Sequence, residues 1–148
     1  MAPGGLSEME EYGQMPGMQR MFQVYGSGEP VTPAVMKDLF GFGLMHDPRH
    51  ATDELVAERY EVARTQPKDV LARMKTPNLG PSLGELSCPI FVMWGLNDEF
   101  CPAAHGELFL DACKDVRLLT FAYTGHWVQV EREAEFNLYA TGFLNEHA

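Results

Sequence analysis

The pattern of apolar and polar positions is clearest in residues 88–148, where it predicts two strands and two helices in alternation. "PIFVMW" (89–94) and "VRLLTFA" (116–122) are short runs of apolar, β-forming residues, which is typical of strands covered on both faces. "HGELFLDACK" (105–114) lies between them and "REAEFNLYATGFLNE" (132–146) follows, and both are predicted to be helices. The last helix is expected to bury one apolar stripe, formed by Phe136, Tyr139, Phe143 and Leu144. This order predicts an α/β fold with a βαβα unit and parallel strands.

Residues 8–87 contain helical patches and no convincing strand. "VTPAVMKDLFGFGL" (31–44) and "TDELVAERYEVARTQ" (52–66) each carry apolar residues at helical spacing. A third, shorter helix is predicted in "PKDVLARMK" (67–75). The first two helices have threonines placed to cap them, Thr32 and Thr52.

Two parallel strands do not make a stable sheet by themselves. Sheets average about five or six strands, and parallel strands need both faces covered while an open edge invites aggregation. We therefore expect the sheet to be incomplete in this chain and its other strands to come from outside this sequence.

Composition narrows the classes of function. The 148 residues are 45% hydrophobic with a formal net charge of −10, which argues against nucleic acid or an anionic membrane as a partner. No run of about 18 apolar residues is present, and the N-terminus lacks the pattern of a signal peptide. Three widely spaced cysteines are typical of reduced thiols, so a cytoplasmic protein is expected.

Two residues capable of acid–base chemistry follow the two predicted strands. Asp98 lies in "WGLNDEF" after the first strand, and His126 lies in "TGHW" after the second. Because sites in open α/β sheets form beyond the carboxyl ends of the strands, the two side chains are expected to lie side by side. The carboxylate would then fix the histidine tautomer and stabilise the imidazolium when the ring acts as a base. In the alternative interpretation, Asp98 caps the following helix and His126 is an ordinary loop histidine.

These segments resemble a known family. "PIFVMWGLNDEFCP" and "TGHWVQVEREAEFNLYATGFL" resemble the C-terminal end of α/β-hydrolases, and most of all the meta-cleavage-product hydrolases, which cut carbon–carbon bonds in ring-fission products of aromatic or steroid degradation. "MAPGGLS" resembles that family's stretch at the end of the strand that follows the nucleophile helix, and "ERYEVARTQP" resembles its lid segment with a substrate-binding arginine. The resemblance implies the end of a core strand and its loop at 1–7, a helical lid at 8–87 and the C-terminal part of the hydrolase core at 88–148.

The resemblance also assigns roles to individual residues. It makes Asp98 the acid and His126 the base of a catalytic triad. Arg59 would contact the polar end of the substrate, and Trp127 and Phe100 would wall the site. The plainer alternatives are that Arg59 is a solvated helix residue paired with Glu58 or Glu61, and that the two aromatic residues belong to the core.

"GPSLG" (80–84) matches G-x-S-x-G, the pattern around the nucleophile of serine hydrolases. A working nucleophile needs a strand before it and a helix after it, and Ser82 has neither. We therefore interpret Ser82 as part of the connection from lid to sheet. The nucleophile and oxyanion loop are expected upstream of Met1, and the isolated chain is expected to be inactive.

The resulting hypothesis is a hydrolase that cuts a C–C bond in a small-molecule ring-fission dienoate without a metal or an organic cofactor. His46 and His50 stand four apart, but Pro48 between them argues against a metal site. The alternatives are an esterase or haloperoxidase-like hydrolase, and a non-catalytic truncated module. The expected protein partner is the missing N-terminal half or another copy of the chain.

Overall fold

The computed structural model describes residues 2–67 and 76–148. Within them a two-stranded parallel sheet is formed by β1 (Ile90–Gly95) and β2 (Val116–Phe121). The strands pair in register from Ile90 opposite Val116 to Gly95 opposite Phe121. The α/β class and the parallel pairing predicted from the sequence are therefore confirmed.

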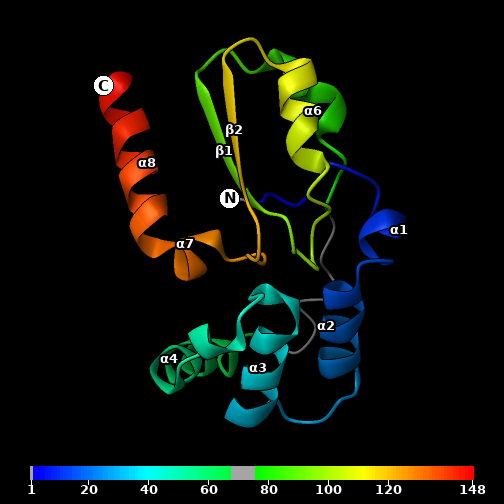
Figure 1. Ribbon diagram of the computed structural model, residues 1–148. Helices are drawn as coiled ribbons and strands as arrows, with labels where there is room; N and C mark the ends of the chain where they lie inside the picture. The colour runs from blue at the N-terminus through cyan, green and yellow to red at the C-terminus, as the bar shows by residue number, and fades with distance from the viewer. Residues whose placement is uncertain (1, 68–75) are drawn as a thin grey trace.

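Helices cover the two faces of this sheet (Figure 1). α6 (His105–Ala112) connects the strands and lies on one side, while α7 (Val128–Glu131) and α8 (Glu133–Glu146) lie on the other. Side chains alternate between the two layers, as the twofold period of a strand requires. Val92 and Trp94 of β1 pack in the core that contains Phe109 of α6, and Met93 packs with Val128 of α7. Covering both faces explains why the strands read as continuous apolar runs.

The apolar face of α8 is narrower than expected. Phe136 and Ala140 pack against the sheet layer, and the Phe143 ring lies 5.4 Å from that of Phe91 between centroids. Tyr139 is 43% exposed and Leu144 is 66% exposed, so the predicted four-residue stripe is wrong. Phe136, Ala140 and Phe143 have the spacing i, i+4, i+7, which places them on one face of the helix. Residues on either side of this face point away from the sheet.

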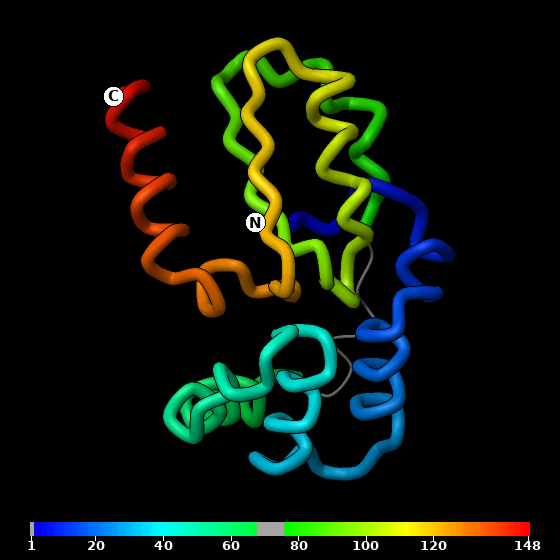
Figure 2. The backbone as a smooth tube through the Cα atoms, in the orientation of Figure 1, coloured from blue at the N-terminus to red at the C-terminus, as the bar shows by residue number. Residues whose placement is uncertain are grey.

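Residues 9–63, within the segment expected to be the lid and called the lid below, form several short helices, most of which lie beyond the carboxyl ends of the strands (Figures 1 and 2). A separate apolar cluster forms its interior, built from Met36, Phe40, Met45, Ala51 and Val56. The helices are α1 (Met9–Tyr12), α2 (Pro16–Gly26), α3 (Pro33–Leu39), η1 (Phe40–Leu44), η2 (Pro48–His50) and α4 (Asp53–Ala63).

Both threonine caps are present, since Thr32 Oγ1 accepts a hydrogen bond from the backbone N–H of Val35 and Thr52 Oγ1 from that of Leu55. The helix predicted at 31–44 is interrupted after Leu39, where η1 contains Gly43 at φ 94°. A positive φ is favourable only for glycine, so this residue permits the bend. The sequence did not predict α2 specifically, and the helix predicted at 67–75 falls largely on residues 68–75, outside those described.

No helix among the described residues is long and apolar enough to cross a membrane.

Candidate active site

The loop after β1 holds Asp98 in a fixed, buried position. Its Oδ1 accepts hydrogen bonds from the backbone N–H groups of Phe100 (2.8 Å) and Cys101 (2.9 Å). The residue is only 7% exposed. Asp98 thus organises the turn that follows it, whereas α6 begins later, after Ala104, without a side-chain cap.

The second carboxylate oxygen of Asp98 faces His126. Oδ2 lies 2.8 Å from His126 Nδ1, although 28 positions separate the two residues. Parallel strands bring both loops to one edge of the sheet, and Asn97 N–H donates to Thr124 O to hold the loops together. Asp98 and His126 therefore lie side by side, as expected. Asp98 also forms the turn that follows it, so it makes both sets of contacts at once.

His126 remains accessible on its other side. Its side chain is 22% exposed, and among residues 2–67 and 76–148 its only hydrogen-bonded partner is Asp98. The Phe100 ring lies against the imidazole, with 5.4 Å between ring centroids. A histidine held by a carboxylate at Nδ1 and open at Nε2 is arranged to accept and return protons.

Arg59 and Trp127 meet at the junction between lid and core. The Arg59 Cζ atom lies 5.1 Å from the centroid of the Trp127 ring, and Phe40 packs against the same ring at 5.0 Å. Glu61, one of the two partners considered for Arg59, instead forms an ion pair with Arg64. The Arg59 guanidinium therefore lies over the ring of the residue that follows His126 in the chain.

Ser82 lies at the opposite end of the sheet. It is exposed in η3 (Gly80–Glu85), and no strand leads into it. The adjacent Leu83 carbonyl accepts a hydrogen bond from Cys113 Sγ, at the end of α6 that leads into the start of β2. His126 follows the far end of β2, so the sheet separates these two residues.

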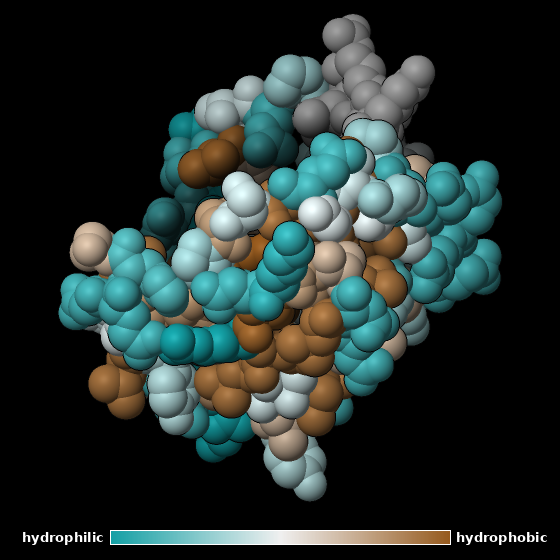
Figure 3. Space-filling view, turned by 90° about the horizontal axis from the view of Figure 1, so that it is seen from above, coloured by the Kyte–Doolittle hydropathy of each residue, from teal (hydrophilic) through white to brown (hydrophobic). Residues whose placement is uncertain are grey.

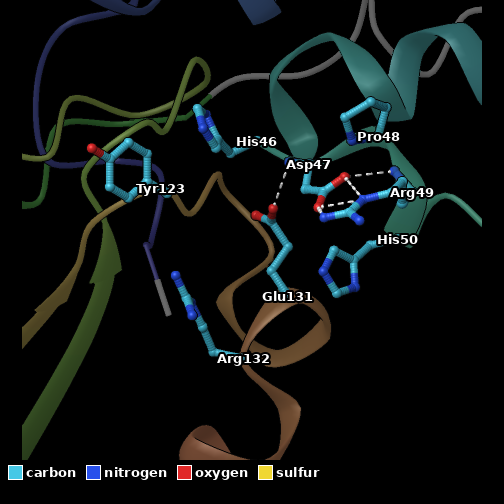
Figure 4. Close-up of a pocket in the computed structure, with 8 residues that line it drawn as sticks. All are labelled: His46, Asp47, Pro48, Arg49, His50, Tyr123, Glu131 and Arg132. Carbon is cyan, nitrogen blue, oxygen red and sulfur yellow. Dashed lines mark hydrogen bonds and ion pairs between the residues drawn. The ribbon is translucent and has the colours of Figure 1, made fainter.

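A cavity of about 520 Å³ opens beside the lid–core junction (Figure 4). His46 and His50 line it together with Tyr123, whose ring centroid is 5.8 Å from that of His46. Hydrogen bonds from Arg49 hold the pKa of the Asp47 carboxyl well below its usual range. None of the five predicted site residues lines this cavity. A smaller cavity of about 320 Å³ separates η1 from the Asp98 loop and is bordered by Asn97 and Glu99.

Two residues that hold the histidine loop were not predicted from the sequence. Glu131 Oε2 accepts a hydrogen bond from Gly125 N–H, and Arg132 donates to the Ala122 carbonyl and to Thr124 Oγ1. No local signal in the sequence marked Glu131, because it directly precedes the helix predicted at 132–146, where an acidic residue is favourable for the helix dipole.

The fold and the Asp98–His126 pair define the class of protein. The chain belongs to the α/β-hydrolases, and within them it is homologous to the meta-cleavage-product hydrolases over roughly their C-terminal half.

Three similar proteins illustrate this relationship. The 2-hydroxy-6-oxo-6-phenylhexa-2,4-dienoate hydrolase of Comamonas testosteroni is 31% identical, over 99% of this chain and 53% of the relative. The 2-hydroxy-6-oxononadienedioate/2-hydroxy-6-oxononatrienedioate hydrolase of the same species is also 31% identical, over 97% and 52%. A crystallised meta-cleavage product hydrolase of Pseudomonas fluorescens IP01 superimposes with a TM-score of 0.71 at 22% identity, over 88% of this chain and 51% of that one.

The chain therefore spans about half the length of the relatives it matches. No protein-family model matches it.

Proposed function

We propose that this chain carries the acid–base pair and the lid of a hydrolase that cleaves a carbon–carbon bond in a ring-fission dienoate. The observation that carries the proposal is the 2.8 Å contact between Asp98 Oδ2 and His126 Nδ1 at the lid–core junction. The relationship to dienoate hydrolases at 31% identity supports the substrate class.

In the proposed reaction, His126 moves protons through Nε2. Asp98 holds the ring through Nδ1 and stabilises the imidazolium that forms. The histidine first transfers a proton as the dienol becomes a ketone. It then acts as the base for the attack of the nucleophile on the substrate carbonyl, which leads to C–C cleavage. No metal or organic cofactor is assigned a step in this scheme.

The serine nucleophile and the oxyanion donors are proposed to come from residues other than those described. Ser82 is exposed at the wrong end of the sheet, and within the described ranges no serine hydroxyl is hydrogen-bonded to His126. A triad without its nucleophile retains only a small residual rate. We therefore propose that the 148-residue chain alone is inactive towards dienoates and works with a complementary N-terminal half, in a reducing, cytoplasmic setting.

Three residues are proposed to bind the substrate. Phe100 and Trp127 would form walls beside His126, and Arg59 would attract the carboxylate end of the dienoate from the lid. The packing of Arg59 over Trp127 supports this, because it orients the cation near the site while the side chain remains exposed.

The activity is tested by a fusion protein. It joins the N-terminal half of the 2-hydroxy-6-oxo-6-phenylhexa-2,4-dienoate hydrolase of Comamonas testosteroni to this chain. The fusion is expected to consume a 2-hydroxy-6-oxo-6-phenyl dienoate much faster than p-nitrophenyl esters, while the chain alone consumes neither. His126→Ala should abolish turnover in the fusion. His147→Ala, which changes an exposed histidine at the end of α8, should not. A fusion that favours the ester would support the esterase alternative, and labelling of Ser82 by a serine-directed probe in the chain alone would contradict the assignment of the nucleophile.

Arg59 is tested separately in the same fusion. Arg59→Gln is expected to raise KM for the anionic dienoate with a smaller change in kcat. Arg64→Gln is the matched control, because Arg64 caps the end of the same helix, α4, but is paired with Glu61. Equal KM values for the two variants would remove Arg59 from the substrate site.

A further inference from the structure

Glu131 joins the histidine loop to the lid through one carboxylate. Oε2 accepts a hydrogen bond from Gly125 N–H at 2.5 Å, and Oε1 accepts one from Asp47 N–H at 2.9 Å. Gly125 directly precedes His126, whereas Asp47 lies between η1 and η2 in the lid. The two donors therefore belong to a core loop and a lid segment that are distant in sequence. Figure 4 shows the hydrogen bond between Glu131 and Asp47.

The backbone of the lid is also in close contact with the backbone on both sides of His126. Trp127 N–H donates to the Leu44 carbonyl, so the lid is also bonded to the residue after His126. A Cβ atom on Gly125 would lie 2.8 Å from His46 N and 2.9 Å from Leu44 O. His126 is thus flanked on both sides by residues whose backbone is bonded to or pressed against the lid.

A carboxylate suits this place because it accepts two hydrogen bonds and donates none. Both partners are backbone N–H groups, and hydrogen bonds to an ionised acceptor are the stronger kind. An amide in its place would keep one oxygen and direct an NH₂ group at the other donor.

We propose that Glu131 is a positioning residue for His126, which fixes the histidine loop and the lid to each other so that neither moves independently. The lid's docking state would then set the orientation of the imidazole. The proposal concerns the site described above, but its test requires no substrate and is decided separately from the proposed activity.

The test is amide hydrogen exchange by NMR on the full chain, comparing Glu131→Gln with Glu133→Gln. The control removes the same charge two residues away, at an exposed position. In Glu131→Gln, the amides of Gly125 and Asp47 should both exchange about tenfold faster or more, while amides paired between β1 and β2 keep their protection. The imidazole proton between His126 Nδ1 and Asp98 should also exchange faster with water, which a purely local loss of packing would not cause.

Unchanged protection at Gly125 and Asp47 would overturn the proposal, and so would an equal loss across β1 and β2. If Glu131→Gln does not fold, Glu131→Asp replaces it. The shorter carboxylate keeps the charge but cannot span both donors, so protection should fall at one of the two amides. Retention at both would equally refute the proposal.

Discussion

At the scale of single residues, the two carboxylate oxygens of Asp98 have separate hydrogen-bond partners. Oδ1 closes the turn to Phe100 and Cys101, and Oδ2 faces His126. Because the two oxygens have separate partners, a substitution that preserves one of them separates the two roles.

Asp98→Asn is expected to keep the fold and lose the chemistry. Its remaining oxygen still accepts from the turn, while its NH₂ faces His126 Nδ1 and selects the wrong tautomer. In the active fusion kcat should fall on the order of 10⁴-fold with little change in melting temperature. Turnover assays and circular dichroism melts measure both quantities, and a kcat within tenfold of the parent would contradict the assignment.

Cys101 is expected to be unreactive in the native state. Burial, with a further contribution from the Asp98 charge, raises the pKa of its thiol to about 12. Since the thiolate is the reactive form, iodoacetamide at pH 8 should modify exposed Cys88 first and Cys101 only after unfolding. Peptide mass spectrometry distinguishes the two sites, and early modification of Cys101 would contradict the prediction.

The raised pKa of Cys101 also makes the free energy of unfolding depend on pH. An unfolded chain releases the Cys101 proton near pH 9, whereas the folded chain holds it to about pH 12. Unfolding then releases a proton over this range, so stability should fall as pH rises from 9 to 12. Cys101→Ala should show a smaller loss over that range in denaturant titrations, and identical pH slopes would refute the assignment.

At the scale of elements, the two loops beyond the strands interlock through glycines. Gly95 ends β1, and a Cβ atom there would overlap the carbonyl oxygens of Gly125 and Thr124. These are backbone atoms that cannot rotate away, so the absence of a side chain is what allows the histidine loop to cross the end of β1.

Gly95→Ala is therefore expected to lower the free energy of unfolding by roughly 1–3 kcal/mol. Gly142→Ala in the middle of α8 is the matched control, because nothing lies within 4 Å of its Cβ position. That substitution should stabilise the helix by roughly 0.5–1 kcal/mol. Urea titrations of both variants give the comparison, and effects of the same sign would contradict the steric explanation.

At the scale of the whole molecule, the described sheet has no further strand paired to the outer edge of β1 or of β2. Several large apolar side chains are also exposed to solvent. Figure 3 shows hydrophobic patches exposed among polar groups on one face. Leu138 of α8 is 67% exposed and Leu110 of α6 is 48% exposed. Unpaired strand edges and exposed apolar groups both favour association.

The chain by itself is accordingly expected to self-associate at micromolar concentration. Sedimentation velocity across a concentration series measures this, together with a thermal melt at each concentration. A monomer that melts in one sharp transition would show that the open-edge argument fails for this chain.

The sequence was sufficient for the elements whose local signals agree. Apolar runs identified β1 and β2, threonine caps marked the starts of α3 and α4, and the order of strands placed Asp98 beside His126. It failed where local signals compete: the break after Leu39 depends on a positive φ at Gly43, and the exposure of Leu144 depends on which line of α8 faces the sheet.

What the sequence by itself determined is the class of the fold and the adjacency of Asp98 and His126, because strand periodicity and strand order follow from residues close in the chain. Only the tertiary structure decided that Arg59 lies over Trp127, that Ser82 stands at the far end of the sheet, and that Glu131 joins two backbones. Those contacts depend on how distant segments pack, and no local pattern encodes which backbone N–H group a carboxylate will meet.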